Sequence, residues 1–391
     1  MKAESDHRGV LFEDKQLGPF PMHRLRRVDK PTTLITHNIQ RVDEREHALN
    51  RAARGDYGPA AEKEARRIGV RYPLAISQKN TALQLRSLEQ NAVVAPDKVP
   101  VTQDPKVLSR HIKRLGYFLK ADVMGICQLP QSAVYSHDIK GNPIDINYQY
   151  AIVIVMSKEY QTVKASQGYD WIVDSISYQC YQHLALVACT MADYIRRLGY
   201  PAVAEYTFKR ASGGMRVMFP PLLLWAGMGE ISRAGIILNP FLGLDFKAAA
   251  VLTDLPLEPD KSIDFGLQDF CQHCNICARA CPSDAIPTGD KVMHNGYETW
   301  KLDERRCASF SILNQKGTFC NTCIKVCPWT RPHTWPHNLV RWAVEHSSLA
   351  RRIAIKTDTI RGREKTEEEE KWWFDLEEVD GILRIPPTKS N

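Results

Sequence analysis

Eight of the eleven cysteines lie in one stretch toward the C-terminal end, and their spacing is typical of iron–sulfur ligands. A first run of the form Cys-x-x-Cys-x-x-Cys-x-x-x-Cys-Pro extends from Cys271 to Pro282, and a second run that lacks one cysteine extends from Cys320 to Pro328. Cys307 lies between the two runs. Cysteines at i, i+3 and i+6 can supply three of the four thiolates that a cubane cluster needs. The pattern therefore predicts two 4Fe–4S clusters.

The fourth cysteine of each run is expected to cross to the other cluster, as it does in ferredoxins with two clusters. Cys307 would replace the cysteine that the second run lacks. One cluster would then be held by Cys271, Cys274, Cys277 and Cys327, and the other by Cys281, Cys307, Cys320 and Cys323.

A pair of structural zinc sites is the main alternative, because Cys-x-x-Cys also binds zinc. Zinc sites do not need the continuation to Cys-Pro, which favours clusters. Disulfides are disfavoured because cysteines this close cannot all pair in good geometry, and because no secretory signal precedes them. Cys127, Cys180 and Cys189 are assigned to packing, as free cysteines usually are.

The composition is that of a globular protein, with 43% apolar and 25% charged residues in a chain of 391. The net charge of +7 is modest and spread out, which indicates solubility rather than a nucleic-acid surface. The longest apolar run, residues 217–228, contains two prolines and is too short to cross a bilayer. The N-terminal residues lack a secretory or twin-arginine signal. We therefore expect a cytoplasmic protein with no nucleic-acid or membrane partner.

Helical and strand-like patterns alternate along the chain, which predicts an α/β or α+β domain followed by the cysteine module. Residues 1–58 are expected to form an extended surface arm. A buried apolar segment around 222–228 and a polar C-terminal tail with an exposed Trp372–Trp373 pair are also expected. Helices are predicted at residues 60–68, 81–90, 104–119, 169–198 and 338–348. Strands are predicted at residues 122–127, 150–156, 201–206, 235–238 and 247–253.

The long helix predicted at 169–198 has two distinct faces. The first face is an apolar stripe that we expect to be core, formed by Ile176, Cys180, Leu184, Val187, Met191, Ile195 and Leu198. The second face carries Tyr181, Ala185, Ala188 and Ala192. Its small side chains would let a flat body approach the helix backbone, although another helix could cover this face equally well.

Four segments together carry a resemblance to a known family: LGYPAV from Leu198, AGMGEISRAGIILNPFLG from Ala226, VLTDLPLEPDKSIDFG from Val251, and the cysteine runs that end in CPW. On these segments, the chain resembles the cobalamin-dependent reductive dehalogenases and looks most like their cytoplasmic, catabolic members. The related epoxyqueuosine reductases have a similar order of cysteines, including the isolated Cys307.

The resemblance implies an α+β protein with a nitroreductase-like cobalamin-binding domain and a C-terminal ferredoxin-like module with two 4Fe–4S clusters. It implies an N-terminal arm and helices over 1–103, a cobalamin-binding catalytic domain over 104–262, the cluster module over 263–335 and a C-terminal helix and tail over 336–391. The resemblance implies a base-off cobalamin without a protein ligand to cobalt, and the absence of an Asp-x-His-x-x-Gly motif fits this. The implied substrates are halogenated phenols or hydroxybenzoates, and a separate ferredoxin or flavodoxin-type protein would supply electrons. A homodimer is left open.

The resemblance also assigns catalytic residues. Tyr181 would donate the proton, and Lys247 would lie beside it, because a nearby cation stabilises the phenolate and makes the phenol a better acid. Tyr178, one turn away, is the alternative donor. Arg305 and Arg306, just before Cys307, are candidates for binding a substrate oxyanion, although such arginines often only balance the charge of a cluster.

Glycines are the candidates for close approach to the corrin ring and its nucleotide tail. One candidate loop contains Gly213 and Gly214 together with the neighbouring Ser212, and another contains Gly227 and Gly229. Ordinary turn glycines would look the same.

Two other functions remain open from the sequence. An epoxyqueuosine reductase-like enzyme would act on a modified tRNA base, but it would need a basic RNA-binding face and an acidic proton donor, which we do not find. A non-catalytic electron-transfer or corrinoid-carrier protein would bind the same cofactors, yet its turnover would not depend on Tyr181.

Overall fold

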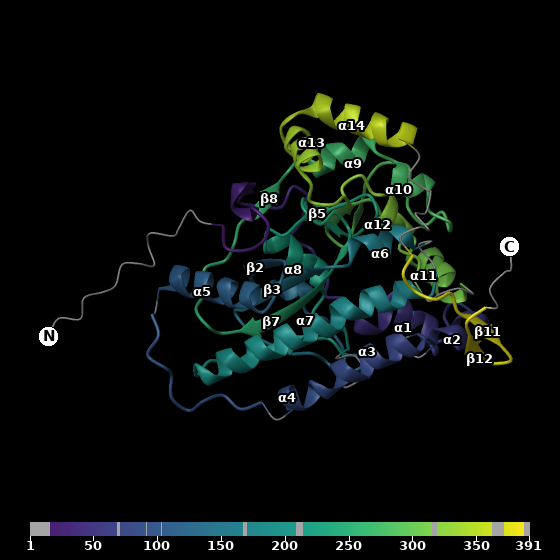
Figure 1. Ribbon diagram of the computed structural model, residues 1–391. Coiled ribbons are helices and arrows are strands. Elements are labelled where there is room, and N and C mark those ends of the chain that lie inside the picture. Colours follow the sequence, from purple (N-terminus) through teal and green to yellow (C-terminus); the bar gives the residue numbers. More distant parts are fainter. Residues whose placement is uncertain are drawn as a thin grey trace.

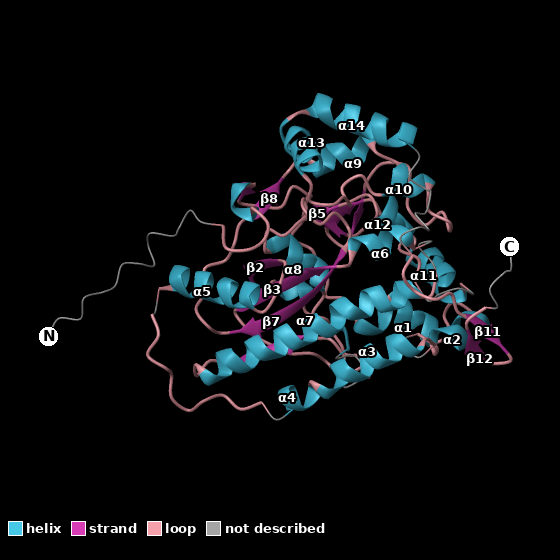
Figure 2. Cartoon of the chain, viewed as in Figure 1, coloured by secondary structure: helices cyan, strands magenta, loops and turns pink. Residues whose placement is uncertain are grey.

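A four-stranded antiparallel sheet forms the centre of the protein (Figures 1 and 2). The computed structural model describes residues 16–68, 71–90, 92–102, 104–166, 170–208, 214–314, 319–361 and 371–386. The strand order is β2-β3-β7-β4. These strands are β2 (Val123–Gln128), β3 (Tyr150–Ser157), β4 (Ala202–Glu205) and β7 (Phe246–Thr253).

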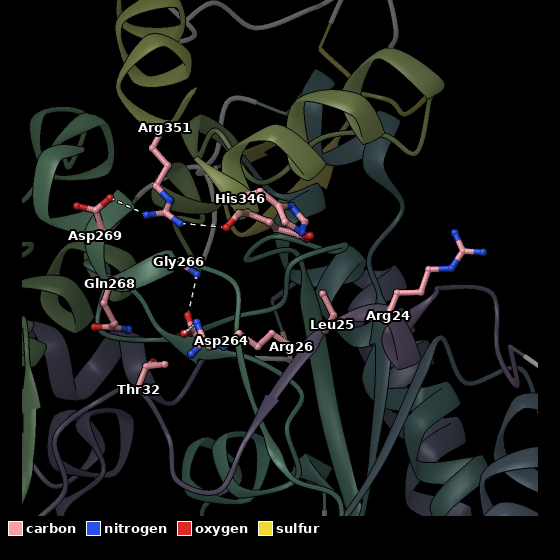
Figure 3. A pocket seen from close by; sticks show the side chains of 11 residues that line it. Arg24, Leu25, Arg26, Thr32, Asp264, Gly266, Gln268, Asp269, His346 and Arg351 are labelled. Carbon is pink, nitrogen blue, oxygen red and sulfur yellow. Dashed lines mark hydrogen bonds and ion pairs between the residues drawn. The ribbon is translucent and has the colours of Figure 1, made fainter. Parts of the chain in front are cut away.

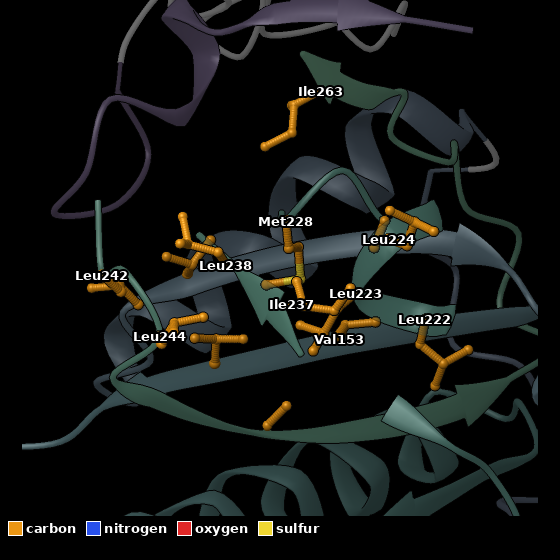
Figure 4. Close-up of a cluster of buried hydrophobic side chains, with 14 of the residues drawn as sticks. Val153, Leu222, Leu223, Leu224, Met228, Ile237, Leu238, Leu242, Leu244 and Ile263 are labelled. Carbon is orange, nitrogen blue, oxygen red and sulfur yellow. The ribbon is translucent and has the colours of Figure 1, made fainter. Parts of the chain in front are cut away.

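The sheet separates two apolar cores. On one face, alternate residues such as Ile152, Ile154 and Val251 pack against the helices α3 (Pro73–Gln84), α5 (Pro105–Phe118) and α7 (Ile172–Arg197). On the other face, Val153, Val155 and Ala250 pack with α8 (Phe219–Trp225) and with the cysteine-containing segment (Figure 4). This alternation follows from the two-residue period of a strand, and both faces are covered, so the strands are apolar throughout.

The cysteine module lies on the second core and is bounded by short elements. The N-terminal strand β1 (Arg26–Val28) pairs with β8 (Ser262–Asp264), and β5 (Glu230–Ile231) pairs with β6 (Ile237–Leu238). The module itself contains α9 (Leu267–His273), α10 (Ile276–Arg279), the hairpin β9 (Val292–His294) and β10 (Tyr297–Thr299), α11 (Glu304–Leu313) and α12 (Thr322–Val326). Helices α1 (Ala48–Ala53) and α2 (Pro59–Ala65) pack on α11. Helices α4 (Arg86–Gln90) and α6 (Tyr160–Ala165) flank α7.

Most predicted elements are confirmed. Helix α5 begins after Asp104, whose side chain caps it by accepting from the backbone N–H of Lys106 at 2.9 Å, and Pro105 occupies its first position. Helix α7 and strands β2, β3, β4 and β7 lie within a few residues of their predicted bounds. The apolar stripe of α7 is buried throughout, as predicted. The structure confirms the α+β class, because the central sheet is wholly antiparallel.

Several expectations are wrong. The N-terminal arm is not only extended, because it contributes β1 and α1. The apolar segment near 222–228 is buried, as predicted, but the sequence did not show that its first residues belong to a helix, α8, whose two prolines stand at the first turn, where a helix tolerates them. The predicted polar tail begins with a second helix, α14 (Ser348–Arg361), packed on α13 (Trp335–His346), and a hairpin of β11 (Glu377–Val379) and β12 (Ile382–Arg384) follows. Trp372 is exposed as expected, but Trp373 is buried.

The alanine face of α7 does not lie open to a flat body. Ala185, Ala188 and Ala192 are fully buried and share one core with Ala75 and Ala82 of α3. Helix α3 runs alongside α7 (Figure 1). Small residues therefore allow two helices to pack closely here, which was the alternative explanation of the pattern.

A buried ion pair fixes the C-terminal half of α7. Arg196 lies 3.0 Å from Glu89 of α4, and both side chains are almost fully buried. We expect Glu89→Ala to lower the free energy of unfolding by about 3–5 kcal/mol, because it leaves a buried guanidinium without its counter-ion. Thermal unfolding followed by circular dichroism measures the effect. An unchanged melting temperature would contradict the assignment.

Candidate functional site

Three cysteines of the first run and one from the end of the second run line one small cavity. Cys271, Cys274, Cys277 and Cys327 surround it, together with Phe270, Leu244 and Trp329. The first three come from α9, α10 and the turn between them, and Cys327 follows α12. These are the four cysteines that the sequence analysis grouped, and we call them the inner group.

The other four cysteines form an outer group, made of Cys281, Cys307, Cys320 and Cys323. Burial, together with the neighbouring Cys320 and Cys281, raises the pKa of the Cys307 thiol to about 11. Cys323 interacts electrostatically with all three of the others and with Cys277 of the inner group. All four outer cysteines are partly exposed, whereas most of the inner group is buried. The two groups are therefore adjacent, and the outer group lies nearer to solvent.

The donor set fits two cubane clusters. Each group contains four sulfur atoms, and each draws one cysteine from a distant part of the chain, as cluster binding by two such runs requires. Within the described part of the chain, no three His, Cys, Asp or Glu side chains converge closely enough to bind a single metal ion. A cubane is larger than a single ion, so its four thiolates need not meet at one point.

Arg233 holds the inner group in place, although the sequence analysis gave it no role. It is buried, with 1% of its surface exposed, and it lines the inner cavity. Its guanidinium donates to the backbone oxygens of Cys271, Pro287 and Gly289 at 2.9–3.0 Å and to that of Gln272 at 3.2 Å. It also packs 4.9 Å from the ring centre of Trp300. Its only sequence signal was a lone cation in a mostly apolar, glycine-rich segment.

A tight turn connects the inner cavity to strand β7. Gly243 has a φ of +63° and lies against the backbone of Thr330, so close that an added Cβ would be 2.6 Å from it. The backbone N–H of the next residue, Leu244, donates to the hydroxyl of Thr330 at 3.2 Å. Only glycine fits this combination of left-handed φ and close approach. The turn thereby joins the end of the second cysteine run to the start of β7.

Lys247, three residues after Leu244, lies next to Tyr181 of α7. The Lys247 ammonium lies 5.1 Å from the centre of the Tyr181 ring, and the two side chains are hydrogen-bonded. Burial alone would lower the pKa of Lys247, but Tyr181, Cys180 and Asp245 together outweigh it, with Tyr181 contributing most, and the net shift is upward. Lys247 therefore stays charged, and it stabilises negative charge on the phenolic oxygen.

Tyr178 is a less suitable partner for the lysine. It is buried, and burial raises the pKa of its phenol far above the ordinary value. Its ring contacts Phe208 edge-on, with 5.0 Å between ring centres, and lies 6.1 Å from the ring of Tyr181. The lysine contact favours Tyr181 over Tyr178 as the functional tyrosine.

The predicted oxyanion-binding arginines are engaged elsewhere. Arg306 is exposed on α11, 3.4 Å from Asp303, and its guanidinium donates weakly to the backbone oxygen of Asp284. Arg305 packs against the ring of Tyr57 at 5.8 Å. These contacts lie on the side of the outer cysteine group, which favours the charge-balancing alternative over a substrate contact.

The predicted cofactor-binding glycines lie against protein groups. An added Cβ at Gly214 would meet the carboxylate of Glu44, at Gly227 the backbone oxygen of Lys261, and at Gly229 the backbone oxygen of Leu238. Packing or turn formation accounts for all three, and their role toward cobalamin stays a prediction. Ser212 and Gly213 lie outside the described residues.

A larger, charged pocket of about 710 Å³ lies between the N-terminal arm, α9 and the α13–α14 pair (Figure 3). Its charges are largely paired: Arg351 contacts Asp269 at 2.8 Å and Arg26 contacts Asp264 at 3.2 Å. None of the predicted site residues lines it. The pocket therefore does not belong to the candidate site.

Comparison with known proteins assigns the cysteine module and the fold. Residues 270–330 match the family model of the 4Fe–4S dicluster domain. The solved structure of the catabolic reductive dehalogenase NpRdhA in complex with 3-bromo-4-hydroxybenzoic acid is 37% identical and superposes with a TM-score of 0.90, covering 98% of this chain and 56% of that one. A reductive dehalogenase structure described with a mechanism for B12-dependent dehalogenation gives the same identity and TM-score, with 99% and 56% covered.

A curated relative points the same way. The tetrachloroethene reductive dehalogenase of Sulfurospirillum multivorans is 26% identical over 302 residues, which are 67% of this chain and 58% of that protein. The chain thus spans little more than half the length of these relatives. Across the described ranges, no helix combines the length and the apolar character needed to cross a bilayer.

The grouping of the cysteines predicts a selective loss of iron. We expect Cys307→Ser to lose about half of the bound iron and sulfide, because it removes one of four ligands from the outer group only. Cys189→Ser is the matched control, since Cys189 is buried in the core of α7, away from both runs. Iron and acid-labile sulfide analysis with electron paramagnetic resonance of the reduced protein measures both. Equal loss from the two variants would contradict the grouping.

Arg233 provides a second prediction for the module. We expect Arg233→Met to reduce cluster content and to lower thermal stability by about 3 kcal/mol or more, because several buried backbone oxygens lose their donor at once. Arg279→Met, an exposed arginine in the same module, should leave both properties unchanged. Full cluster content in Arg233→Met would show that the guanidinium does not hold the inner group.

Proposed function

We propose that this chain, a relative of the reductive dehalogenases in sequence and in fold, carries the catalytic site of an enzyme that removes halide from an organic substrate with cobalamin as cofactor. The main support is the position of the Tyr181–Lys247 pair. Lys247 is three residues from Leu244, and Leu244 lines the inner cysteine cavity. An extended chain covers at most about 10 Å in three residues, so the Lys247 backbone lies within that distance of Leu244, although its side chain lies on the α7 side of the sheet and the inner cavity on the other.

The two cysteine groups provide a path for electrons toward this centre. The outer group is partly exposed and the inner group is mostly buried, so electrons would enter at the outer cluster and pass inward. A separate ferredoxin or flavodoxin-type protein would be the donor. In this scheme residues 263–335 form the cluster module, residues 104–262 the catalytic domain, and residues 1–103 and 336–391 surround them.

Cobalamin, when bound, supplies a metal centre whose reduced form can break a carbon–halogen bond. Tyr181 and Lys247 would face it, because both side chains stay partly exposed while their neighbours Cys180 and Ala248 are buried. The overall reaction consumes two electrons and one proton: the carbon–halogen bond breaks, halide leaves with its electron pair, and a carbon–hydrogen bond forms. Tyr181 donates the proton, and Lys247 stabilises the phenolate that remains.

A haloaromatic is the proposed substrate class, most of all a halogenated phenol or hydroxybenzoate. The support is the likeness over nearly the whole chain to a dehalogenase that was solved with 3-bromo-4-hydroxybenzoic acid. Lys247 would also favour a phenolate oxygen near Tyr181, because an ammonium binds oxyanions. Arg306 is no longer part of this proposal, since its charge is paired with Asp303.

Halide release tests the proposal. Protein loaded with clusters and cobalamin is incubated without oxygen with reduced viologen and with brominated or chlorinated phenols, and the released halide is measured. We expect turnover by the unmodified protein and a loss of about 10²–10⁴-fold in Tyr181→Phe, the range that general acids contribute. Cofactor content should not change in the variant.

Tyr200→Phe is a matched control, because Tyr200 is buried at the end of α7 and has its own lysine, Lys98, 4.6 Å from its ring centre. It should retain the full rate. Full activity in Tyr181→Phe would remove that residue from the role of donor. Loaded protein that releases no halide from any haloaromatic would overturn the proposed substrate class.

A further inference from the structure

A second lysine is buried beside the Tyr181–Lys247 pair. Lys158 follows β3 and Asp245 precedes β7, and each has only 4% of its surface exposed. The ammonium of Lys158 lies 3.4 Å from the carboxylate of Asp245. Their backbones are also joined, because the N–H of Lys158 donates to the carbonyl oxygen of Asp245 at 3.1 Å. The pair thus closes the open end of the β3–β7 ladder.

Strand register places this pair on the same face as the catalytic residues. Met156 is opposite Lys247 and Ser157 is opposite Phe246, so Lys158 and Asp245 continue the alternation on the side of α7. Cys180 of α7 lies there as well, and its thiol contacts the backbone oxygen of Ser157 at 3.3 Å. Two ammonium groups, one carboxylate and one phenol therefore share a single buried region.

Asp245 faces both lysines. Burial raises the pKa of Asp245, while the charges of Lys158 and of Lys247 each oppose that rise. Burial lowers the pKa of Lys158, and Asp245 opposes that fall. A carboxylate in a region of low dielectric attracts whichever cation is available. Among the described residues, Lys158 and Lys247 are the cations that act on Asp245, so without Lys158 that role would fall to Lys247.

We propose that Lys158 is a positioning residue that occupies Asp245, so that the charge of Lys247 remains available to Tyr181. The inference rests on the proposed function, in which Tyr181 is the proton donor. Lys158 does not touch the phenol in this scheme. It acts through Asp245 and Lys247, and it prevents a neutral Asp245–Lys247 pair from forming.

Other titratable groups face the same region but are engaged elsewhere. The carboxylate of Asp122 accepts from the N–H and the hydroxyl of Ser157, both at 2.7 Å. Glu159 caps α6 through the N–H groups of Gln161 and Thr162. Burial raises the pKa of Cys180 to about 12, so it stays neutral. Among the described residues, the further titratable groups that interact with this cluster are Asp122, Glu159, Asp174, Tyr178 and Cys180.

A double-mutant cycle tests the proposal with two readouts. Lys158→Met, Asp245→Asn and the double variant are compared with the unmodified protein. The first readout is the ultraviolet difference absorption of tyrosinate against pH, with the matching Tyr181→Phe protein subtracted so that only Tyr181 is observed. The second is kcat for halide release as a function of pH.

We expect Lys158→Met to move the titration of Tyr181 to higher pH by about one unit or more, because a neighbouring cation shifts an acid by that amount. Its kcat at neutral pH should fall at least about tenfold, within the contribution of a general acid. The double variant should restore both values to near those of the unmodified protein, because Lys247 is again without a competing carboxylate. Asp245→Asn alone should not move the titration upward.

Two outcomes would overturn the proposal: an unmoved titration in Lys158→Met, or a double variant as impaired as the single one. If Lys158→Met does not fold, Lys158→Gln and Lys158→Arg are compared, and only the glutamine should shift the titration. Arg196→Met with and without Glu89→Gln is the matched control, since that buried pair also contacts α7 and should affect stability without moving Tyr181.

The cycle separates this inference from the proposed function. The titration needs no turnover, so a shift and its rescue in protein that releases no halide would support the positioning role and reject the substrate class. An active enzyme whose Tyr181 titration is the same in all variants would support the function and reject the role of Lys158.

Discussion

The antiparallel register between β3 and β7 is the constraint on which the candidate site depends. It aligns Met156 with Lys247 and brings Lys158 to Asp245, so that three charged side chains emerge on the side of α7. A slip of one residue would turn every side chain of a strand to the opposite face and bury Lys247 in the other core. The register is well specified, because both faces of these strands are apolar and covered. A precise arrangement of charges is thus built at the end of an otherwise uniform sheet.

The second requirement is a rigid connection between this strand end and the cysteine module. Gly243 and Thr330 form it on one side, where the left-handed glycine lets two backbones meet. Arg233, between β5 and β6, forms a second connection to the module, with one guanidinium bound to carbonyl oxygens of helix α9 and of the loop at residues 287–289. Such contacts hold the module by backbone hydrogen bonds rather than by side-chain packing alone. In the proposed function, electron transfer would benefit, because these contacts fix the position of the inner cavity within the fold.

The sequence predicted best what depends on local spacing. The grouping of eight cysteines followed from two short runs, and the structure brings the same four residues around one cavity. The long helix α7 was visible because its apolar stripe continues through its length. Its alanine face was ambiguous, since a flat ligand and a neighbouring helix call for the same small residues, and α3 proved to cover it. Helix α14 was missed because its polar residues resemble those of a tail.

Functional residues that depend on contacts between distant segments could not be found in this way. Lys158 stands just after a strand, where a lysine is usually solvated, and only the fold shows that it is buried against Asp245. Arg233 lies in a family-like segment without a motif of its own, and its partners are 38–56 residues away. Arg306 shows the opposite error, because nearness to Cys307 in the sequence implied a role that its exposed position does not support.

The charges also explain why such a site would contain two lysines rather than one. A buried carboxylate with a single lysine forms a neutral pair, which has little effect on a neighbouring phenol. Burial by itself lowers the pKa of a lysine, but at Lys247 the neighbouring Tyr181, Cys180 and Asp245 together offset this, and its pKa is raised. With two lysines beside one carboxylate, Lys158 can pair with Asp245 and Lys247 remains in excess, although burial still lowers the pKa of Lys158 and raises that of Asp245. That excess lies next to Tyr181, where a developing phenolate would need it.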